Sequence, residues 1–521
     1  MGVYYESDGL IYGSQDADTL FATGQSASVQ ALGLGGDDSI VFDAYWDHTD
    51  SVDGGAGFDV LSITSASEQL YAVQLTDNVD GIEKVLVSQS QAVSTTVSVE
   101  AGALAGALQV VMDLHLTTGT NLLATAATVA LDVIGSPGHD QLRTGSYDDI
   151  FDLTGGGNDS VEAGGGFDTV SFGAALTALD FADGGGGYDI LSITGPSAGL
   201  GDLSRFPHFE EIALAGAVDH VLIFPDAALD PGSALYINAF AAQRLVFDGS
   251  AETSGQWYID GSAGSDDLRG GAAADQFGFA YGGADTIRGG GGDDTFVAPF
   301  GFDRTDRLRG GAGTDTLLLN GAYAGRIAIG PANLQDCEVI EFGAGFDYAA
   351  KPLAGALGAG FLIDGSGLVA GDSLKFDAGL VTTGGLRILG GGGADTLVGG
   401  AGRDTIQGGA GDDVMAGRKG ADTFLFLQAD VAATGVYNDQ ILLLGGNDVI
   451  DFSGIDAKPG VPGDQAFTVV AAFSGSAGEA IVEYQATPDR TVIGLDLDQD
   501  TQADLAVYLA GDQRGFDGFV W

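Results

Sequence analysis

Aspartates recur at nine-residue intervals in glycine-rich parts of this sequence. Between residues 390 and 425 the repeat GGxGxDxUx, in which U is an apolar residue, occurs four times without a change in spacing. Each aspartate offers a hard carboxylate oxygen, and the glycines permit positive φ and expose backbone carbonyls in tight turns. Oxygen-only ligands in flexible loops suit Ca²⁺ better than Mg²⁺ or Zn²⁺. The pattern therefore predicts several calcium sites.

Three runs of the nonapeptide supply the predicted metal ligands. The run at 390–425 is regular, the run at 261–297 has one step lengthened by a residue, and the run at 135–171 is degraded. The predicted metal ligands are Asp395, Asp404, Asp413, Asp422, Gly390, Gly392, Gly399 and Gly408 in the first run, Asp266, Asp275, Asp285 and Asp294 in the second, Asp140, Asp149, Asp159 and Asp168 in the third, and Asp315 in a single copy. Other single copies contain Asp18, Asp38, Asp59 and Asp189.

Short strands and tight turns must position these ligands. The eighth residue of each repeat is apolar and would point inward from a short strand; in the regular run these residues are Leu397, Ile406, Met415 and Phe424. Two repeats would form one coil of a parallel β-roll, so that turns about eighteen residues apart stack with calcium between them. A ladder of ions would then replace much of the core that so glycine-rich a chain lacks.

The runs resemble the repeats of RTX (repeats-in-toxin) proteins. Residues from about 436 to 521 resemble the C-terminal part of serralysin-type proteins, and the final FDGFVW resembles the tail of their uncleaved type I secretion signals. This resemblance implies export by a type I ABC-transporter machinery and a secreted, extracellular or cell-surface location on a Gram-negative bacterium. The N-terminal MGVYYESDGL has neither the basic region nor the apolar core of a Sec signal, which agrees with that route.

A longer repeat of roughly 125–130 residues organises the chain. Similar motifs open three modules: GGAGFDVLSIT, GGGGYDILSITG and GGAGTDTLLLNG. We predict an N-terminal cap at 1–53, modules at 54–183, 184–309 and 310–426, and a C-terminal region at 427–521. The stretches between nonapeptide runs alternate apolar and polar residues, which is typical of strands. The predicted fold is all-β, with calcium-stabilised parallel β-rolls interspersed with β-solenoid or sandwich segments; the form of 87–134 and 195–258 stays open.

The formal net charge of -54, from 73 acidic and 19 basic residues, limits the possible partners. It argues against nucleic acid and anionic membranes, and no segment is apolar enough to insert into a membrane. The charge also opposes compaction until cations neutralise it. Free calcium inside a cell lies far below the range of extracellular calcium modules, so we expect the chain to fold only after export, when binding adds to folding free energy.

The HExxH motif of serralysin-type zinc proteases is absent from the sequence. None of the five histidines begins an HExxH motif, and His208-Phe209-Glu210-Glu211 lacks the second histidine. Cys337 lies in an apolar context that favours a buried, inert thiol.

One further acidic segment resembles the start of an EF-hand loop. Asp496, Asp498 and Asp500 fit, but Thr501 replaces the required glycine and Val507 the bidentate glutamate. We therefore expect an acidic hairpin turn.

The sequence predicts a protein that is not an enzyme. We expect a calcium-binding structural protein that folds outside the cell and self-assembles into a surface layer or extracellular filament, with itself as the main partner. One alternative is a calcium-dependent adhesin or biofilm matrix protein that binds a cell-surface glycan; another is a carbohydrate-active enzyme on a β-solenoid. Trp46, Trp257 and Tyr258 could stack on sugars, but packing explains them more simply.

Overall fold

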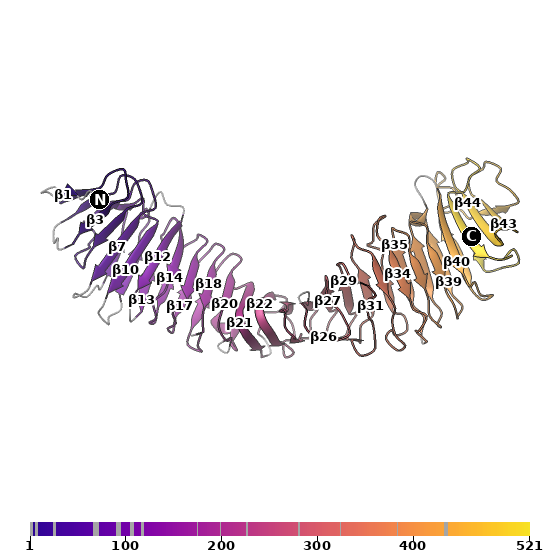
Figure 1. Ribbon diagram of the computed structural model, residues 1–521, viewed down its shortest axis with the longest axis horizontal. Helices are drawn as coiled ribbons and strands as arrows, with labels where there is room; N and C mark the ends of the chain where they lie inside the picture. Colours follow the sequence, from indigo (N-terminus) through magenta and orange to yellow (C-terminus); the bar gives the residue numbers. More distant parts are fainter. Residues whose placement is uncertain are drawn as a thin grey trace. The chain divides into compact units, whose positions relative to one another are not determined.

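The structure is a computed structural model that describes residues 4–5, 9–23, 28–65, 72–89, 95–104, 109–115, 119–174, 176–197, 200–225, 228–279, 282–323, 325–382, 384–431 and 436–521. The chain divides into two compact units, Met1–Asp260 and Gly261–Trp521. In each unit it winds as a parallel β-solenoid, with about 18 turns in all (Figure 1). Among the described residues no helix has the length and apolarity needed to cross a membrane.

The N-terminal unit has two rows of strands, one on each face of the solenoid. Its longer row is parallel throughout and contains β3 (Thr19–Ala22), β5 (Ser39–Phe42), β7 (Val60–Ser65), β10 (Lys84–Gln89), β12 (Gln109–His115), β14 (Ala130–Ile134), β16 (Ile150–Leu153), β18 (Thr169–Phe172), β20 (Ile190–Ile193), β21 (Glu211–Ile223), β22 (Ala234–Asp248) and β23 (Gln256–Asp260). Segments 87–134 and 195–258 therefore continue the solenoid where they are described.

The second row of this unit consists of two sheets. One contains β1 (Tyr4–Tyr5), β2 (Leu10–Tyr12), β4 (Gln30–Leu32), β6 (Ser51–Asp53) and β9 (Val79–Asp80), with β1 antiparallel to β2. The other contains β8 (Ala72–Leu75), β11 (Thr95–Val99), β13 (Thr120–Leu123), β15 (Gln141–Arg143), β17 (Ser160–Glu162) and β19 (Phe181–Asp183), all parallel. A 3-10 helix, η1 (Leu203–Arg205), follows β20.

The C-terminal unit repeats this plan. One row contains β25 (Gln276–Gly278), β27 (Thr295–Ala298), β29 (Thr316–Leu319), β31 (Val339–Phe342), β33 (Leu362–Asp364), β35 (Arg387–Gly391), β37 (Thr405–Gly409), β39 (Thr423–Leu427), β41 (Val449–Gly454) and β46 (Phe519–Val520). The facing strands are β24 (Asp267–Arg269), β26 (Thr286–Gly291), β28 (Arg307–Ala312) and β30 (Leu334–Gln335).

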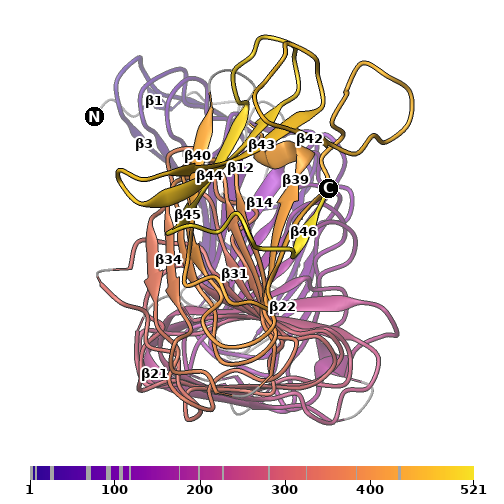
Figure 2. The same ribbon diagram turned by 90° about the vertical axis from the view of Figure 1, so that its right-hand side faces the viewer.

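The facing row ends in a mixed sheet. It runs through β32 (Tyr348–Ala350), β34 (Leu374–Asp377), β36 (Thr396–Val398), β38 (Val414–Ala416), β40 (Tyr437–Leu442), β45 (Leu505–Ala510), β44 (Arg490–Asp496), β43 (Glu479–Gln485) and β42 (Thr468–Val470). The pairs β43–β44 and β44–β45 are antiparallel, and these strands lie side by side in Figure 2. A 3-10 helix, η2 (Gln428–Asp430), follows β39.

The core between the rows is a stack of single apolar side chains. In the regular nonapeptide run Leu397 pairs with Met415, and Ile406 pairs with Phe424, so residues eighteen apart lie above one another. All four side chains are fully buried. This register confirms the predicted β-roll, with two nonapeptides per coil. Because each coil contributes so few large side chains, the turns must supply much of the remaining stability.

Candidate calcium ladders

The sixth-position aspartates of the regular run belong to two ladders, one at each turn of the roll. The first ladder is Asp395, Asp413 and Asp439; the second is Asp404, Asp422 and Asp448. In both, the backbone N–H of one aspartate donates to Oδ1 of the aspartate in the next coil. The N···O distances are 2.9 Å from Asp395 to Asp413 and 2.9 Å from Asp404 to Asp422. All six carboxylates are buried.

The same ladders occur in the other runs. The aspartates predicted at 261–297 and 135–171 all lie in such ladders, with backbone N–H to Oδ1 distances between 2.7 and 3.1 Å. Their members are Asp266, Asp285 and Asp306; Asp275, Asp294 and Asp315; Asp140, Asp159 and Asp180; and Asp149, Asp168 and Asp189. The single copies Asp18, Asp38 and Asp59 form another.

The structure adds ladder members that the nonapeptide pattern does not identify. Asp180, Asp306, Asp439 and Asp448 lie 21 or 26 residues after the preceding rung. Three ladders end on a glutamate: the N–H groups of Asp59, Asp189 and Asp315 donate to Oε2 of Glu83, Glu210 and Glu338, respectively. These glutamates stand in the motifs GIEKV, FEEI and DCEVI of the three modules, so the long repeat contained a signal for them.

Burial raises the pKa of several ladder aspartates, because the charged form loses water that neutral neighbours do not replace. The pKa of Asp395 rises to about 7, that of Asp439 to about 8 and that of Asp294 to about 8, with like charges of neighbouring rungs adding to the effect in each case. Lys84 and Lys351, for example, form ion pairs with Asp113 and Asp377, which lie outside the ladders. The ionised ladders therefore need another source of positive charge.

The free oxygen atoms of the ladders fit a calcium ion. Oδ2 is buried and has no hydrogen-bond partner in several rungs: Asp38, Asp59, Asp149, Asp159, Asp168, Asp189, Asp294, Asp315, Asp395, Asp413 and Asp422. A buried carboxylate oxygen without a partner is destabilising, so an oxygen-seeking cation is the expected complement.

The glycines leave space beside these oxygens. A Cβ on Gly390 would lie 2.3 Å from Oδ2 of Asp395 and 2.2 Å from the carbonyl oxygen of Gly408. A Cβ on Gly399 would lie 2.3 Å from Oδ2 of Asp404. Gly392 lies in the turn between β35 and β36, where a Cβ would lie 2.8 Å from the carbonyl oxygen of Leu368. Carboxylate and carbonyl oxygens thus converge in spaces that only glycine leaves open.

If the ladders hold calcium, the ligands are the carboxylates of the rungs and the carbonyls of the adjoining glycine turns. Bound Ca²⁺ would supply the positive charge that lets neighbouring coils stack with their carboxylates ionised. The protein groups set the coil spacing, because each Oδ1 is already fixed by the N–H of the preceding rung.

Substituting a turn glycine tests this arrangement. A Cβ at Gly408 would lie 2.3 Å from Oδ2 of Asp413, so Gly408→Ala should displace that oxygen at a cost of about 1–3 kcal/mol. We expect the calcium concentration at half-folding, followed by circular dichroism, to rise roughly tenfold. Gly371→Ala is the matched control, because its Cβ would meet nothing within 4 Å. Equal midpoints for the two variants would refute the role given to Gly408.

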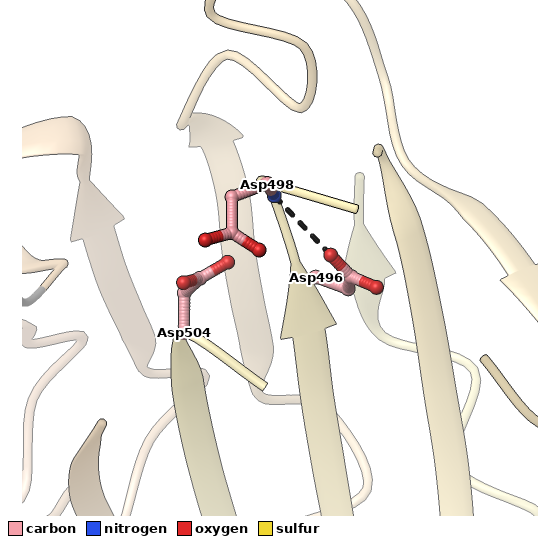
Figure 3. Close-up of side chains that lie close together, drawn as sticks. All are labelled: Asp496, Asp498 and Asp504. Carbon is pink, nitrogen blue, oxygen red and sulfur yellow. Dashed lines mark hydrogen bonds between the residues drawn. The ribbon is translucent and has the colours of Figure 1, made fainter. Parts of the chain in front are cut away.

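The acidic segment near the C-terminus forms a hairpin turn, as predicted. It joins the antiparallel strands β44 and β45, so it lacks the flanking helices of an EF-hand. Asp496, Asp498 and Asp504 gather there, and the N–H of Asp498 donates to Oδ1 of Asp496 at 3.2 Å (Figure 3). Two further backbone N–H groups, of Gln499 and Leu497, donate to Asp496 and Asp504, respectively. Backbone N–H groups of the turn thus hydrogen-bond to its carboxylates and stabilise part of their negative charge.

The residues weighed for catalysis or sugar stacking each have their own surroundings. Exposed His208 contacts Asp183, with 2.7 Å between Nδ1 and Oδ1. Cys337 is buried as predicted, in the turn before β31, and burial raises the pKa of its thiol to about 12. Trp257 is fully buried and stacks on Phe224 at a centroid distance of 5.3 Å, which confirms a packing role.

A parallel β-solenoid with aspartate-glycine turns on both sides defines the class of protein, and comparison with known families agrees. The family model of the RTX calcium-binding nonapeptide repeat matches residues 134–170, 258–277, 279–298, 300–321 and 389–424. These segments therefore carry RTX calcium-binding nonapeptide repeats, as the sequence predicts. No curated protein matches the chain.

Among the solved structures that are similar to part of the chain, one is a subunit of an epimerase. It is the solution structure of the AlgE6R3 subunit from the Azotobacter vinelandii mannuronan C5-epimerase, with 28% sequence identity. The match covers 32% of this chain and 82% of that chain, with a TM-score of 0.22.

Proposed function

We propose that this protein is a secreted structural protein whose solenoid folds when calcium occupies the carboxylate ladders. The buried Oδ2 atoms without partners are the observation that carries this proposal. Each of these oxygen atoms could bind a cation. Without one, the ionised carboxylate would destabilise the coil in which it is buried. Calcium bound only by the folded state would supply folding free energy outside the cell, where its concentration is high enough for weak extracellular sites.

We further propose that folded copies assemble into a surface layer or filament. One support is the net charge of -54, which keeps copies apart until cations neutralise it. A second is that the solenoid and its C-terminal sheet account for the described residues, as expected of a structural protein. Calcium that neutralises the outer acidic groups would remove the repulsion between copies. The type I export route remains part of this proposal, on the resemblance of the C-terminal region to serralysin-type proteins.

Light scattering during a calcium titration tests the assembly. Chelator-treated protein should gain mass well beyond a monomer as calcium rises to a few millimolar, above the range of extracellular calcium modules, and chelator should reverse the gain. A solenoid that folds but stays monomeric would remove self-assembly as the function. Glycan binding would then favour the adhesin, and turnover lost on substituting carboxylates outside the nonapeptides would favour the enzyme.

A further inference from the structure

A pocket of about 330 Å³ opens on one side of the C-terminal unit. Corners of successive coils line it: Arg304 lies before β28, residues 326–333 lie before β30, Lys351 and Leu353 follow β32, and Leu380 follows β34. The backbone joins these corners directly, because the N–H of Ile327 donates to the carbonyl of Ala349 at 2.8 Å and that of Leu353 to Ile329 at 2.9 Å.

The charge of the pocket is opposite to that of the protein. Three of its lining residues, Arg304, Arg326 and Lys351, are basic, and no acidic residue is among the described residues that line it. The whole chain has 73 acidic residues and only 19 basic ones, so this grouping departs strongly from its composition. A concentration of positive charge in an acidic protein draws anions to that point.

Two of the three cations are available to a ligand. Lys351 forms an ion pair with Asp377, with Nζ and Oδ2 2.5 Å apart. Arg304 and Arg326 are exposed, and their guanidinium groups form no ion pair with any described residue. A guanidinium donates through a planar fork that matches the two oxygens of a carboxylate.

Asn333 holds the floor of the pocket in place. It is 3% exposed, and its Nδ2 donates to the carbonyls of Asp303 and Ala328 at 2.8 and 2.7 Å. Its Oδ1 accepts from the N–H of Gly330 at 2.7 Å. These bonds connect the segment that bears Arg304 to the segment that bears Arg326. The pocket is therefore formed before a ligand enters, which lowers the entropy lost on binding.

The remaining wall is aliphatic. Leu353 and Leu380 are 49% and 45% exposed, and Pro331, which also lines the pocket, is exposed. Below them Ile329 is fully buried. An apolar ligand surface placed here would remove both leucine side chains from water, which is favourable.

We propose that this pocket binds a small organic anion that carries a carboxylate on a compact apolar body. Arg304 and Arg326 bind the carboxylate, and Leu353 and Leu380 contact the body. Lys351, already paired with Asp377, adds to the positive potential. A simple anion would leave the leucine wall exposed, and a neutral ligand would leave both guanidinium groups without a partner. No ladder carboxylate is among the described residues that line this site, and the site does not depend on the proposed assembly.

The test uses full-length, calcium-loaded protein and cyclohexanecarboxylate as the probe, observed by ligand-detected NMR titration. Cyclohexanecarboxamide tests the charge, while acetate and inorganic phosphate test the apolar body. We expect the carboxylate to bind at least tenfold more tightly than the amide, acetate or phosphate, because a charge-assisted bidentate bond and apolar burial act together. Equal binding of the amide, or of acetate or phosphate, would overturn the proposal.

Variants locate the binding in this pocket. Arg304→Gln/Arg326→Gln should weaken binding of cyclohexanecarboxylate at least tenfold, and Leu380→Glu should abolish it by placing an acidic group in the pocket. Arg387→Gln/Arg403→Gln is the control, because it removes two exposed arginines outside the pocket. All variants should keep the wild-type calcium midpoint by circular dichroism. Unchanged binding in the first variant, or an equal loss in the control, contradicts the assignment.

Discussion

Replacing Asp404 and Asp413 with alanine raises the calcium concentration at half-folding of the last roll by at least tenfold. The substitutions interrupt both ladders, since Asp404 belongs to one and Asp413 to the other. Each also removes an acceptor: the N–H of Leu386 donates to Asp404 at 2.8 Å and that of Asp395 to Asp413 at 2.9 Å. A hydrogen bond to a charged group contributes about 1.5–3 kcal/mol, and each 1.4 kcal/mol corresponds to roughly a factor of ten.

Circular dichroism during a calcium titration measures this shift. The control Asp464→Ala/Asp517→Ala removes the same number of charges from exposed positions outside the ladders and should leave the midpoint close to that of the wild type. An unchanged β-sheet signal and midpoint in Asp404→Ala/Asp413→Ala would show that these residues are not calcium ligands.

Acid should partly replace calcium in chelator-treated protein. Burial raises the pKa of Asp159 and Asp285 to about 7, and that of Asp294 to about 8, from an ordinary value of 3.8. The calcium-free folded state therefore binds more protons than the unfolded state between these values. Its stability is fully present below about pH 4 and is lost as the pH rises through about 6–8.

The measurement compares calcium-free protein at pH 8 and at about pH 4.5. We expect the β-sheet signal to be weak at pH 8 and to increase strongly on acidification, with the change centred near the raised pKa values. Calcium-loaded protein should keep its β-sheet signal from about pH 6 to pH 8, because bound calcium neutralises the carboxylates there in place of protons. A calcium-free β-sheet signal that is independent of pH, or that falls on acidification, would contradict the burial of ionised ladders.

Much of the fold follows from the nonapeptide itself. The sixth-position aspartates and the eighth-position apolar residues predicted the turns and the inward side chains, and the register of Leu397 with Met415 confirms the two-repeat coil. This succeeded because every coil repeats the same local chemistry, so the global fold is the sum of neighbouring contacts. The division into two units at Asp260 reflects how compactly the chain packs, not where the sequence repeats. It therefore does not test the predicted boundaries of the cap, the modules and the C-terminal region, which stay predictions.

Other parts of the site depend on coil length, which local pattern does not reveal. Asp439 and Asp448 join the ladders across coils that are 26 residues long, and they carry no glycine pair in the expected place. Glu83 ends a ladder because its longer side chain reaches the N–H of Asp59 from the following coil. The sequence also does not reveal the pocket at Arg304 and Arg326, because its lining residues come together only when the corners of successive coils stack.

Calcium uptake and folding of the purified chain, measured together at pH 8, test the central claim most directly. Free calcium should be titrated into chelator-treated protein while a calcium electrode records the ions bound and circular dichroism records the β-sheet signal. The account predicts that the two curves rise together, that several ions bind per chain, and that chelator reverses both. A chain that shows its full β-sheet signal before calcium binds would contradict it.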